Sequence, residues 1–158
     1  MAPSIKEGEV HLCDTSIKAK TLQRGDVIAV KIPRKYRTDF KMAIKRVVAV
    51  AGDSVFCYDG RLYVNGEIEK RRYVGQTHNV TQQIVPNGCV FVLGDNRENS
   101  NDSRVWGPIP YRHVVGKMVR RLNKKNCRKT AKGYKPKSFK ESFKMCKREM
   151  YRKWNLED

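Results

Sequence analysis

Long hydrophobic runs are absent from this chain of 158 residues. Its longest apolar stretches, such as Val47–Ala51 and Val90–Leu93, have five residues or fewer, whereas a membrane-spanning helix needs about 20 apolar residues. No apolar segment at the N-terminus has the character of a signal peptide either. The sequence as it stands therefore excludes an integral membrane protein.

Cysteine is sparse and follows no pattern. The five cysteines cannot all pair with one another, and no two of them form a Cys-x-x-Cys pair. No histidine stands at a zinc-ligand spacing from them. These absences exclude a disulfide scaffold and argue against a metal site.

Acidic residues are also few, since 16 Asp and Glu stand against 34 Lys and Arg, for a net charge of +18. Residues 123–158 carry half of this excess in less than a third of the length. Such a basic patch attracts phosphate groups, either of nucleic acid or of an anionic lipid surface. Composition does not separate these two partners from a solvated tail that only aids solubility.

Residues 1–122 have the pattern of a β-rich domain, because short runs rich in Val and Ile alternate with turn dipeptides. Two of these dipeptides, Asp59-Gly60 and Asn65-Gly66, favour tight hairpin turns with positive φ. The predicted strands are Val27–Ile32, Met42–Ala51, Val55–Tyr58, Arg61–Val64, Cys89–Leu93 and Tyr111–Leu122.

The segment after residue 122 has a different pattern. Residues 123–137 contain Gly133 and Pro136 and show no periodicity, which predicts a basic linker. From Ser138 the apolar residues recur at helical spacing, which predicts a basic amphipathic helix over residues 138–158. Such a helix either lies on a membrane surface or packs its apolar stripe against the domain or a partner. The pattern leaves both placements open.

Two segments contain the residues best suited to chemistry. The loop Gly94–Arg104 is dense in Asn, Asp and Ser, which bond to nearby backbone and form rigid turns. Lys45 lies within a run of Val and Ile, so its amine either points outward or is buried. Burial disfavours the charged form and lowers the pKa, which yields a neutral amine able to act as a general base.

Taken together, these segments resemble type I signal peptidases, the Ser/Lys membrane-associated proteases that remove signal peptides from exported proteins. Met1–Ile5 is similar to the family's first box, Ser-Met-x-Pro-Thr/Ser-Leu/Ile, and Arg24–Ile28 is similar to the second. Ile44–Val48 is similar to the lysine box. Gly94–Arg104 matches the last box, Gly-Asp-Asn-x-x-x-Ser-x-Asp-Ser-Arg, at every defined position.

The resemblance implies an all-β fold of antiparallel sheets over residues 1–122, the signal-peptidase catalytic core, in which residues 54–88 are a reduced insertion. It implies a serine endopeptidase that cleaves N-terminal signal peptides from secreted preproteins at the outer, extracytoplasmic face of the cell membrane. Signal peptides and the membrane are then its partners. No metal or cofactor is implied, because Ser/Lys chemistry needs none.

The family also implies a role for each matching residue. Lys45 would be the general base, and Ser100 would bond to its amine and orient it. Met1 and Pro3 would line the cleft, where the substrate binds as an extended strand with small residues before the cut. Ion pairs that hold the boxes together would be formed by Arg46, Asp95, Asp102 and Arg104.

The family's nucleophilic serine directly precedes the methionine of the first box, which is Met1 here. Its oxyanion-hole hydroxyl and membrane anchor lie further upstream. We expect a truncated chain, or a start assigned at an internal methionine, whose parent continues upstream with Ser and an apolar helix of about 20 residues. The chain by itself is then expected to lack peptidase activity. Ser4, three residues past the nucleophile's place, is not assigned that role.

Three other functions fit parts of the sequence. Ser/Lys self-cleaving repressors share a similar β core, but the DNA-binding module and cleavable linker that they need are not found ahead of the core. The net charge and the aromatic residues between positions 134 and 154 suggest a nucleic-acid-binding protein acting through the basic tail, although the resemblance implies no nucleic-acid partner. A catalytically inactive module that still binds signal peptides is the third.

Overall fold

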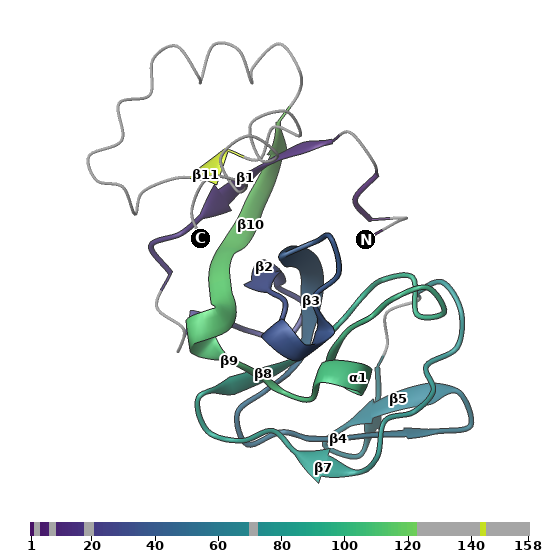
Figure 1. Ribbon diagram of the computed structural model, residues 1–158. Coiled ribbons are helices and arrows are strands. Elements are labelled where there is room, and N and C mark those ends of the chain that lie inside the picture. Colours follow the sequence, from purple (N-terminus) through teal and green to yellow (C-terminus); the bar gives the residue numbers. More distant parts are fainter. Residues whose placement is uncertain (2–3, 7–8, 18–20, 70–72, 123–142, 145–158) are drawn as a thin grey trace.

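Two antiparallel β-sheets dominate the computed structural model, which describes residues 1, 4–6, 9–17, 21–69, 73–122 and 143–144 (Figure 1). The larger sheet contains β1 (Val10–Asp14), β2 (Val27–Lys31), β3 (Met42–Val50), β8 (Cys89–Leu93), β9 (Ile109–Pro110), β10 (Val114–Leu122) and β11 (Phe143–Lys144). The smaller sheet contains β4 (Ser54–Tyr58), β5 (Arg61–Val64), β6 (Glu67–Ile68) and β7 (Gln83–Ile84). The predicted all-β fold is confirmed.

The strand order places β3 near the middle of the larger sheet. That order is β11-β1-β10-β2-β3-β8-β9, and the smaller sheet has the order β6-β5-β4-β7. The named strands pair antiparallel with one another, and an isolated parallel bridge joins Val74 to Asn96. A strand with neighbours on both sides has its backbone fixed by two hydrogen-bonded ladders, so the side chains of β3 have a rigid support.

The hairpin between β4 and β5 forms as its turn sequence predicts. Asp59 and Gly60 have φ values of 48° and 68°, which is the left-handed conformation that a two-residue hairpin turn requires. The next turn has the same form, because Asn65 and Gly66 have φ values of 53° and 80°. These two turns fold the chain back on itself and build the smaller sheet.

Several elements differ from the sequence prediction. β1 was not predicted, because its sequence, Val-His-Leu-Cys-Asp, has a weak apolar pattern. β10 begins at Val114, since Tyr111–His113 form the short 3₁₀ helix η3 after Pro110. The predicted loop Gly94–Arg104 runs into the short helix α1 (Ser103–Trp106), whose first turn is capped by the side chain of Asp102. A second 3₁₀ helix, η2 (Arg34–Tyr36), lies between β2 and β3.

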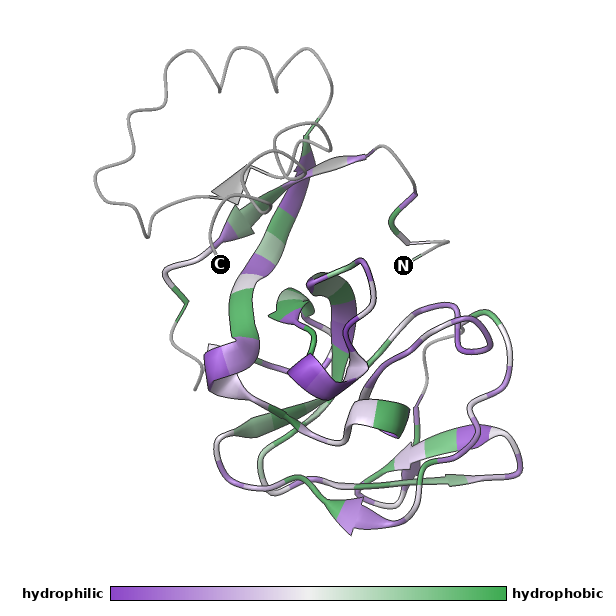
Figure 2. Ribbon diagram, viewed as in Figure 1, coloured by the Kyte–Doolittle hydropathy of each residue, from purple (hydrophilic) through white to green (hydrophobic). Residues whose placement is uncertain are grey.

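The hydrophobic core has two clusters, and both include residues from β3 and β8. Val48 and Phe91 belong to the cluster beneath the smaller sheet, whereas Val47 and Val92 belong to the cluster beneath β2 and β9. β8 is hydrophobic along its length (Figure 2), as expected for a strand covered on both faces.

The segment predicted as a linker and helix is described only at β11. There Phe143–Lys144 pairs with β1 as a strand, because the edge of β1 offers unpaired backbone groups. At these two residues the structure differs from the predicted helix. The predicted linker and the rest of the helix lie outside the described residues. Within the described part of the chain, no helix combines the length and apolar composition needed to cross a membrane.

Candidate active site

One strand carries both basic residues of the lysine box. Lys45 and Arg46 follow one another in β3, and successive side chains of a strand point to opposite faces of the sheet. The backbone of Lys45 pairs with Ile28 in β2, and that of Arg46 pairs with Leu93 in β8. The side chains of Lys45 and Arg46 therefore contact different residues.

The Lys45 amine contacts the hydroxyl of Ser100, 55 residues further along the chain. Nζ of Lys45 donates a hydrogen bond to Oγ of Ser100 at 2.8 Å. Gly94 permits this approach, because a Cβ atom there would overlap the Ser100 side chain and lie 3.6 Å from Nζ. The ring of Trp106 lies near the amine, with its centroid 5.6 Å from Nζ. The two predicted catalytic residues are thus brought together.

Burial is the main influence on the charge of Lys45. It lowers the pKa of the amine below its ordinary value of 10.5, because the ammonium form loses its hydration. The negative charge of Asp102 opposes this shift, and the positive charge of Arg104 adds to it. The neutral amine therefore forms at a lower pH than it would on a surface lysine.

Asp102 is fully buried behind Ser100. Its carboxylate accepts hydrogen bonds from Arg104 Nε at 2.8 Å and Nη2 at 2.9 Å, and from the Gly94 N–H at 3.0 Å. Burial alone would raise the pKa of Asp102, but these hydrogen bonds outweigh it and hold the pKa below its ordinary value. Asp102 is therefore an ionised acceptor.

A second buried ion pair joins β3 to the loop Gly94–Arg104. Arg46 donates to both carboxylate oxygens of Asp95, at 2.8 Å and 2.6 Å, and to the carbonyl oxygen of Gly25 at 2.8 Å. Burial would raise the pKa of Asp95, yet Arg46 and Ser4 lower it overall through hydrogen bonds. Arg46–Asp95 thus spans the two boxes as the resemblance implies. The pair Asp102–Arg104 differs, because both of its residues belong to the same loop.

Arg97 was missed by the sequence analysis, because it occupies an undefined position of the last box. Its side chain is only 2% exposed. It donates to Thr77 at 2.6 Å and to Glu69 at 2.7 Å, and its guanidinium lies 4.1 Å from the centre of the Tyr73 ring. It also donates to the carbonyl oxygen of Gly94 at 3.2 Å. Arg97 therefore fixes the loop Gly94–Arg104 to the segment that connects β6 with β7.

The amino group of Met1 interacts electrostatically with Lys45. Burial lowers the pKa of its amino group, and the charge of Lys45 lowers it further. The backbone nitrogen of Met1 is thus within electrostatic reach of the Lys45 amine. The neighbouring Ser4 contributes to lowering the pKa of Asp95. Pro3, the other predicted cleft residue, lies outside the described residues.

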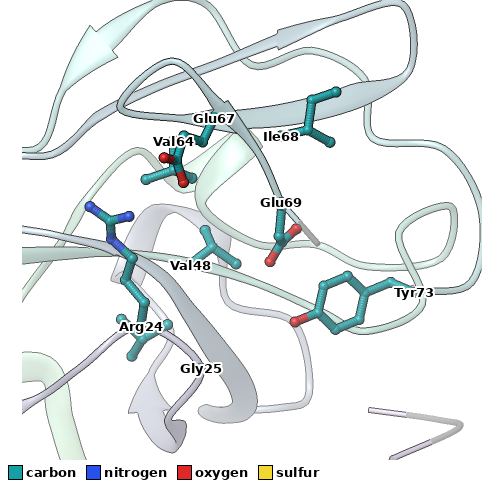
Figure 3. A pocket seen from close by; sticks show the side chains of 9 residues that line it. Arg24, Gly25, Val48, Val64, Glu67, Ile68, Glu69 and Tyr73 are labelled. Carbon is teal, nitrogen blue, oxygen red and sulfur yellow. The ribbon is translucent and has the colours of Figure 1, made fainter. Parts of the chain in front are cut away.

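A separate pocket lies between the Arg24–Gly25 turn, β3 and the smaller sheet (Figure 3). Tyr73 and Val48 are among its lining residues, whereas Lys45 and Ser100 are not. Arg24 forms an ion pair with Asp53. The pocket is therefore distinct from the Lys45–Ser100 site. In the described residues, no cluster of His, Cys, Asp and Glu side chains has the arrangement of a metal site.

Comparison with protein families gives a match over most of the chain. The family model described as "Signal peptidase, peptidase S26" matches residues 1–122. Signal peptidase I V of Bacillus subtilis (strain 168) is 35% identical over 133 residues, which cover 73% of this chain and 76% of that protein. Thylakoidal processing peptidase 1 of Arabidopsis thaliana is 45% identical over 78 residues, which cover 48% of this chain and 23% of that protein.

A solved structure gives a similar result. The crystal structure of a signal peptidase I from Enterococcus faecalis has a TM-score of 0.51 and 30% sequence identity, covering 66% of this chain and all of that chain. The chain spans less than two thirds of the length of several curated relatives that it matches.

Proposed function

Because the chain belongs to the signal peptidase family, peptidase S26, we propose that its β core hydrolyses peptide bonds at the end of signal peptides in exported preproteins. The observation that carries this proposal is the hydrogen bond between the half-buried Lys45 amine and Ser100. A buried amine near a hydroxyl is the arrangement that a Ser/Lys mechanism needs. Arg46 and Asp95, with the pair Asp102 and Arg104, support this geometry.

In the proposed mechanism, the nucleophile is a serine that directly precedes Met1. Neutral Lys45 takes the proton from that hydroxyl while its oxygen attacks the scissile carbonyl carbon, and the lysine then gives the proton to the leaving amine. A water molecule hydrolyses the resulting ester, again with Lys45 as base. The position of Met1 near the amine supports this placement.

The substrate is proposed to bind as an extended strand beside the Met1 segment, with small residues before the cut. Met1 and Pro3 would line this cleft. The catalytic core would lie at the extracytoplasmic face of a membrane, where preproteins emerge. The division into a core over residues 1–122 with a reduced insertion over residues 54–88, a linker over 123–137 and a basic tail over 138–158 is part of the same proposal.

The test compares two chains that are extended at the N-terminus and differ in one residue. In one the residue directly before Met1 is Ser, and in the matched control it is Ala. A fluorogenic peptide with an Ala-x-Ala sequence before the bond is the substrate. We expect cleavage by the Ser chain, none by the Ala chain, and none by the Ser chain with Lys45→Ala.

Equal cleavage by the Ser and Ala chains, or undiminished cleavage after Lys45→Ala, would overturn the mechanism. Peptide binding by both chains without turnover by either would instead favour an inactive signal-peptide-binding module. The rate should rise with pH as Lys45 loses its proton, and the midpoint of this rise should lie below 10.5, because burial lowers the pKa of Lys45.

A further inference from the structure

Gly94 is held through both of its backbone polar groups. Its N–H donates to the carboxylate of Asp102 at 3.0 Å, and its carbonyl oxygen accepts a hydrogen bond from Nε of Arg97 at 3.2 Å. A Cβ atom at this glycine would overlap the Ser100 side chain, so the backbone lies directly against the hydroxyl that contacts Lys45. A shift of Gly94 would therefore move Ser100 relative to the amine.

The hold on the carbonyl of Gly94 comes from outside its own loop. The two remaining nitrogens of the Arg97 guanidinium donate to the hydroxyl of Thr77 at 2.6 Å and to the carboxylate of Glu69 at 2.7 Å. Both partners belong to the connector, by which we mean the described residues 69 and 73–82 between β6 and β7. Each nitrogen of this buried guanidinium thus donates to a different residue.

Backbone hydrogen bonds join the same two segments. The N–H of Val74 donates to the carbonyl oxygen of Asp95 at 3.0 Å, and the N–H of Arg97 donates to that of Val74 at 2.8 Å. These bonds form the parallel bridge between Val74 and Asn96. The Tyr73 ring, which also lines the pocket between the two sheets (Figure 3), lies 4.1 Å from the guanidinium of Arg97. This part of the connector therefore lies along the start of the loop.

We propose that Arg97 is a positioning residue through which the connector holds Lys45 and Ser100 in their working geometry. Arg97 acts on this pair through the carbonyl of Gly94, against which Ser100 is packed. This inference rests on the proposed function. It goes beyond that function because it gives the smaller sheet, through its connector, a part in aligning the general base.

An arginine is suited to this task, because its planar fork presents donors to several acceptors at once. The carboxylate of Glu69 neutralises its charge, which a buried cation requires. A lysine would keep the charge, but its ammonium is a compact point charge that does not match three acceptors arranged around a planar fork. Arg97→Lys should therefore keep a cation beside Glu69 and release the carbonyl of Gly94.

The first experiment needs no cleavage, so it separates failure of this inference from failure of the proposed function. Lysine-labelled chain is titrated by NMR, and the Lys45 signal is assigned by its absence in Lys45→Arg. When the loop loosens, the amine gains water, so the pKa of Lys45 in Arg97→Lys should rise toward its ordinary value of 10.5.

Val85→Ala is the matched control for this titration. Val85 is a buried core residue, and its truncation destabilises the fold through lost packing without removing a contact of Arg97. The control should leave the titration of Lys45 unchanged. No change in Arg97→Lys, or the same change in both variants, would overturn the proposal and indicate a merely structural role.

The second experiment decides the question even if Arg97→Lys does not fold. Thr77→Val removes the hydroxyl that accepts from Arg97 and keeps the shape of the side chain, whereas Thr77→Ser keeps the hydroxyl. In the Ser-extended chain, Thr77→Val should lower kcat about 10-fold with little change in KM, because the base is misaligned. Thr77→Ser should restore kcat, and NMR should show a raised pKa of Lys45 in Thr77→Val alone. Equal behaviour of the two variants would refute the inference.

Discussion

Replacing Arg46 with Ala should destabilise the fold strongly, because it leaves the Asp95 carboxylate buried without its cation. Asp95 is 0% exposed, and Arg46 supplies two of its hydrogen bonds as well as one to Gly25. Breaking a buried pair by removing one partner costs about 3–5 kcal/mol. With a urea slope of about 2 kcal/mol per molar, the unfolding midpoint should fall by about 2 M.

The loss of stability in Arg46→Ala should depend on pH, and the pKa shift of Asp95 determines the direction of this dependence. Asp95 has a lowered pKa in the folded chain, so its stabilising contribution is present above its unfolded pKa and is lost as the pH falls through the folded pKa. Without Arg46, burial raises the pKa of Asp95, and protonation relieves the buried charge. The difference in unfolding free energy between the two chains should therefore shrink as the pH is lowered from about 7 to about 4.

Urea denaturation followed by circular dichroism measures both effects. Arg121→Ala is the matched control, because Arg121 also pairs with a carboxylate, that of Glu9, but its side chain is 69% exposed. The control should leave the midpoint nearly unchanged, since exposed pairs contribute little. If Arg46→Ala lowers the midpoint no more than Arg121→Ala does, the buried pair of Arg46 and Asp95 does not stabilise the fold more than an exposed pair.

Three further predictions concern single residues. Gly94→Ala should separate Lys45 from Ser100 by steric overlap, and an NMR titration should then show a changed pKa for Lys45; an unchanged titration would contradict the close packing. Phe91→Ala should reduce stability by about 3–5 kcal/mol in urea, because the ring is fully buried, and a loss below about 1 kcal/mol would be inconsistent with that core. Burial raises the pKa of the Cys13 thiol to about 11, so Cys13 should resist iodoacetamide at about pH 8 until urea unfolds the chain; rapid labelling of the native protein, seen by mass spectrometry, would argue otherwise.

The sequence predicted the strands that have a strong local pattern and the hairpin turns with Asp-Gly and Asn-Gly. It also indicated Lys45 and Ser100, because both stand in motifs of a known family. Their contact depends on the close approach of Gly94, which no local pattern shows. For Lys45 the residues alone left burial and exposure open, since the outcome depends on which loop covers the strand.

Arg97 shows why other parts of the site could not be predicted. Its partners Thr77 and Glu69 lie 20 and 28 residues away, in the segment that connects β6 with β7, and only the tertiary fold brings that segment to Arg97. An arginine in a polar loop has the same local sequence whether it is solvated or buried. β1 was not predicted for a related reason. It pairs with β10, whose residues lie more than a hundred positions further along the chain, and no local pattern shows such a pairing.

β3 and β8 contribute side chains to both hydrophobic clusters, and this affects how the protein unfolds. Val47 and Val48 are adjacent in β3, and their side chains belong to separate hydrophobic clusters. Unfolding of β3 therefore disrupts both clusters, so neither cluster can unfold while the other stays folded. Calorimetry of the core should therefore record one cooperative endotherm, in which loss of the smaller sheet and loss of the Lys45 environment occur at the same temperature.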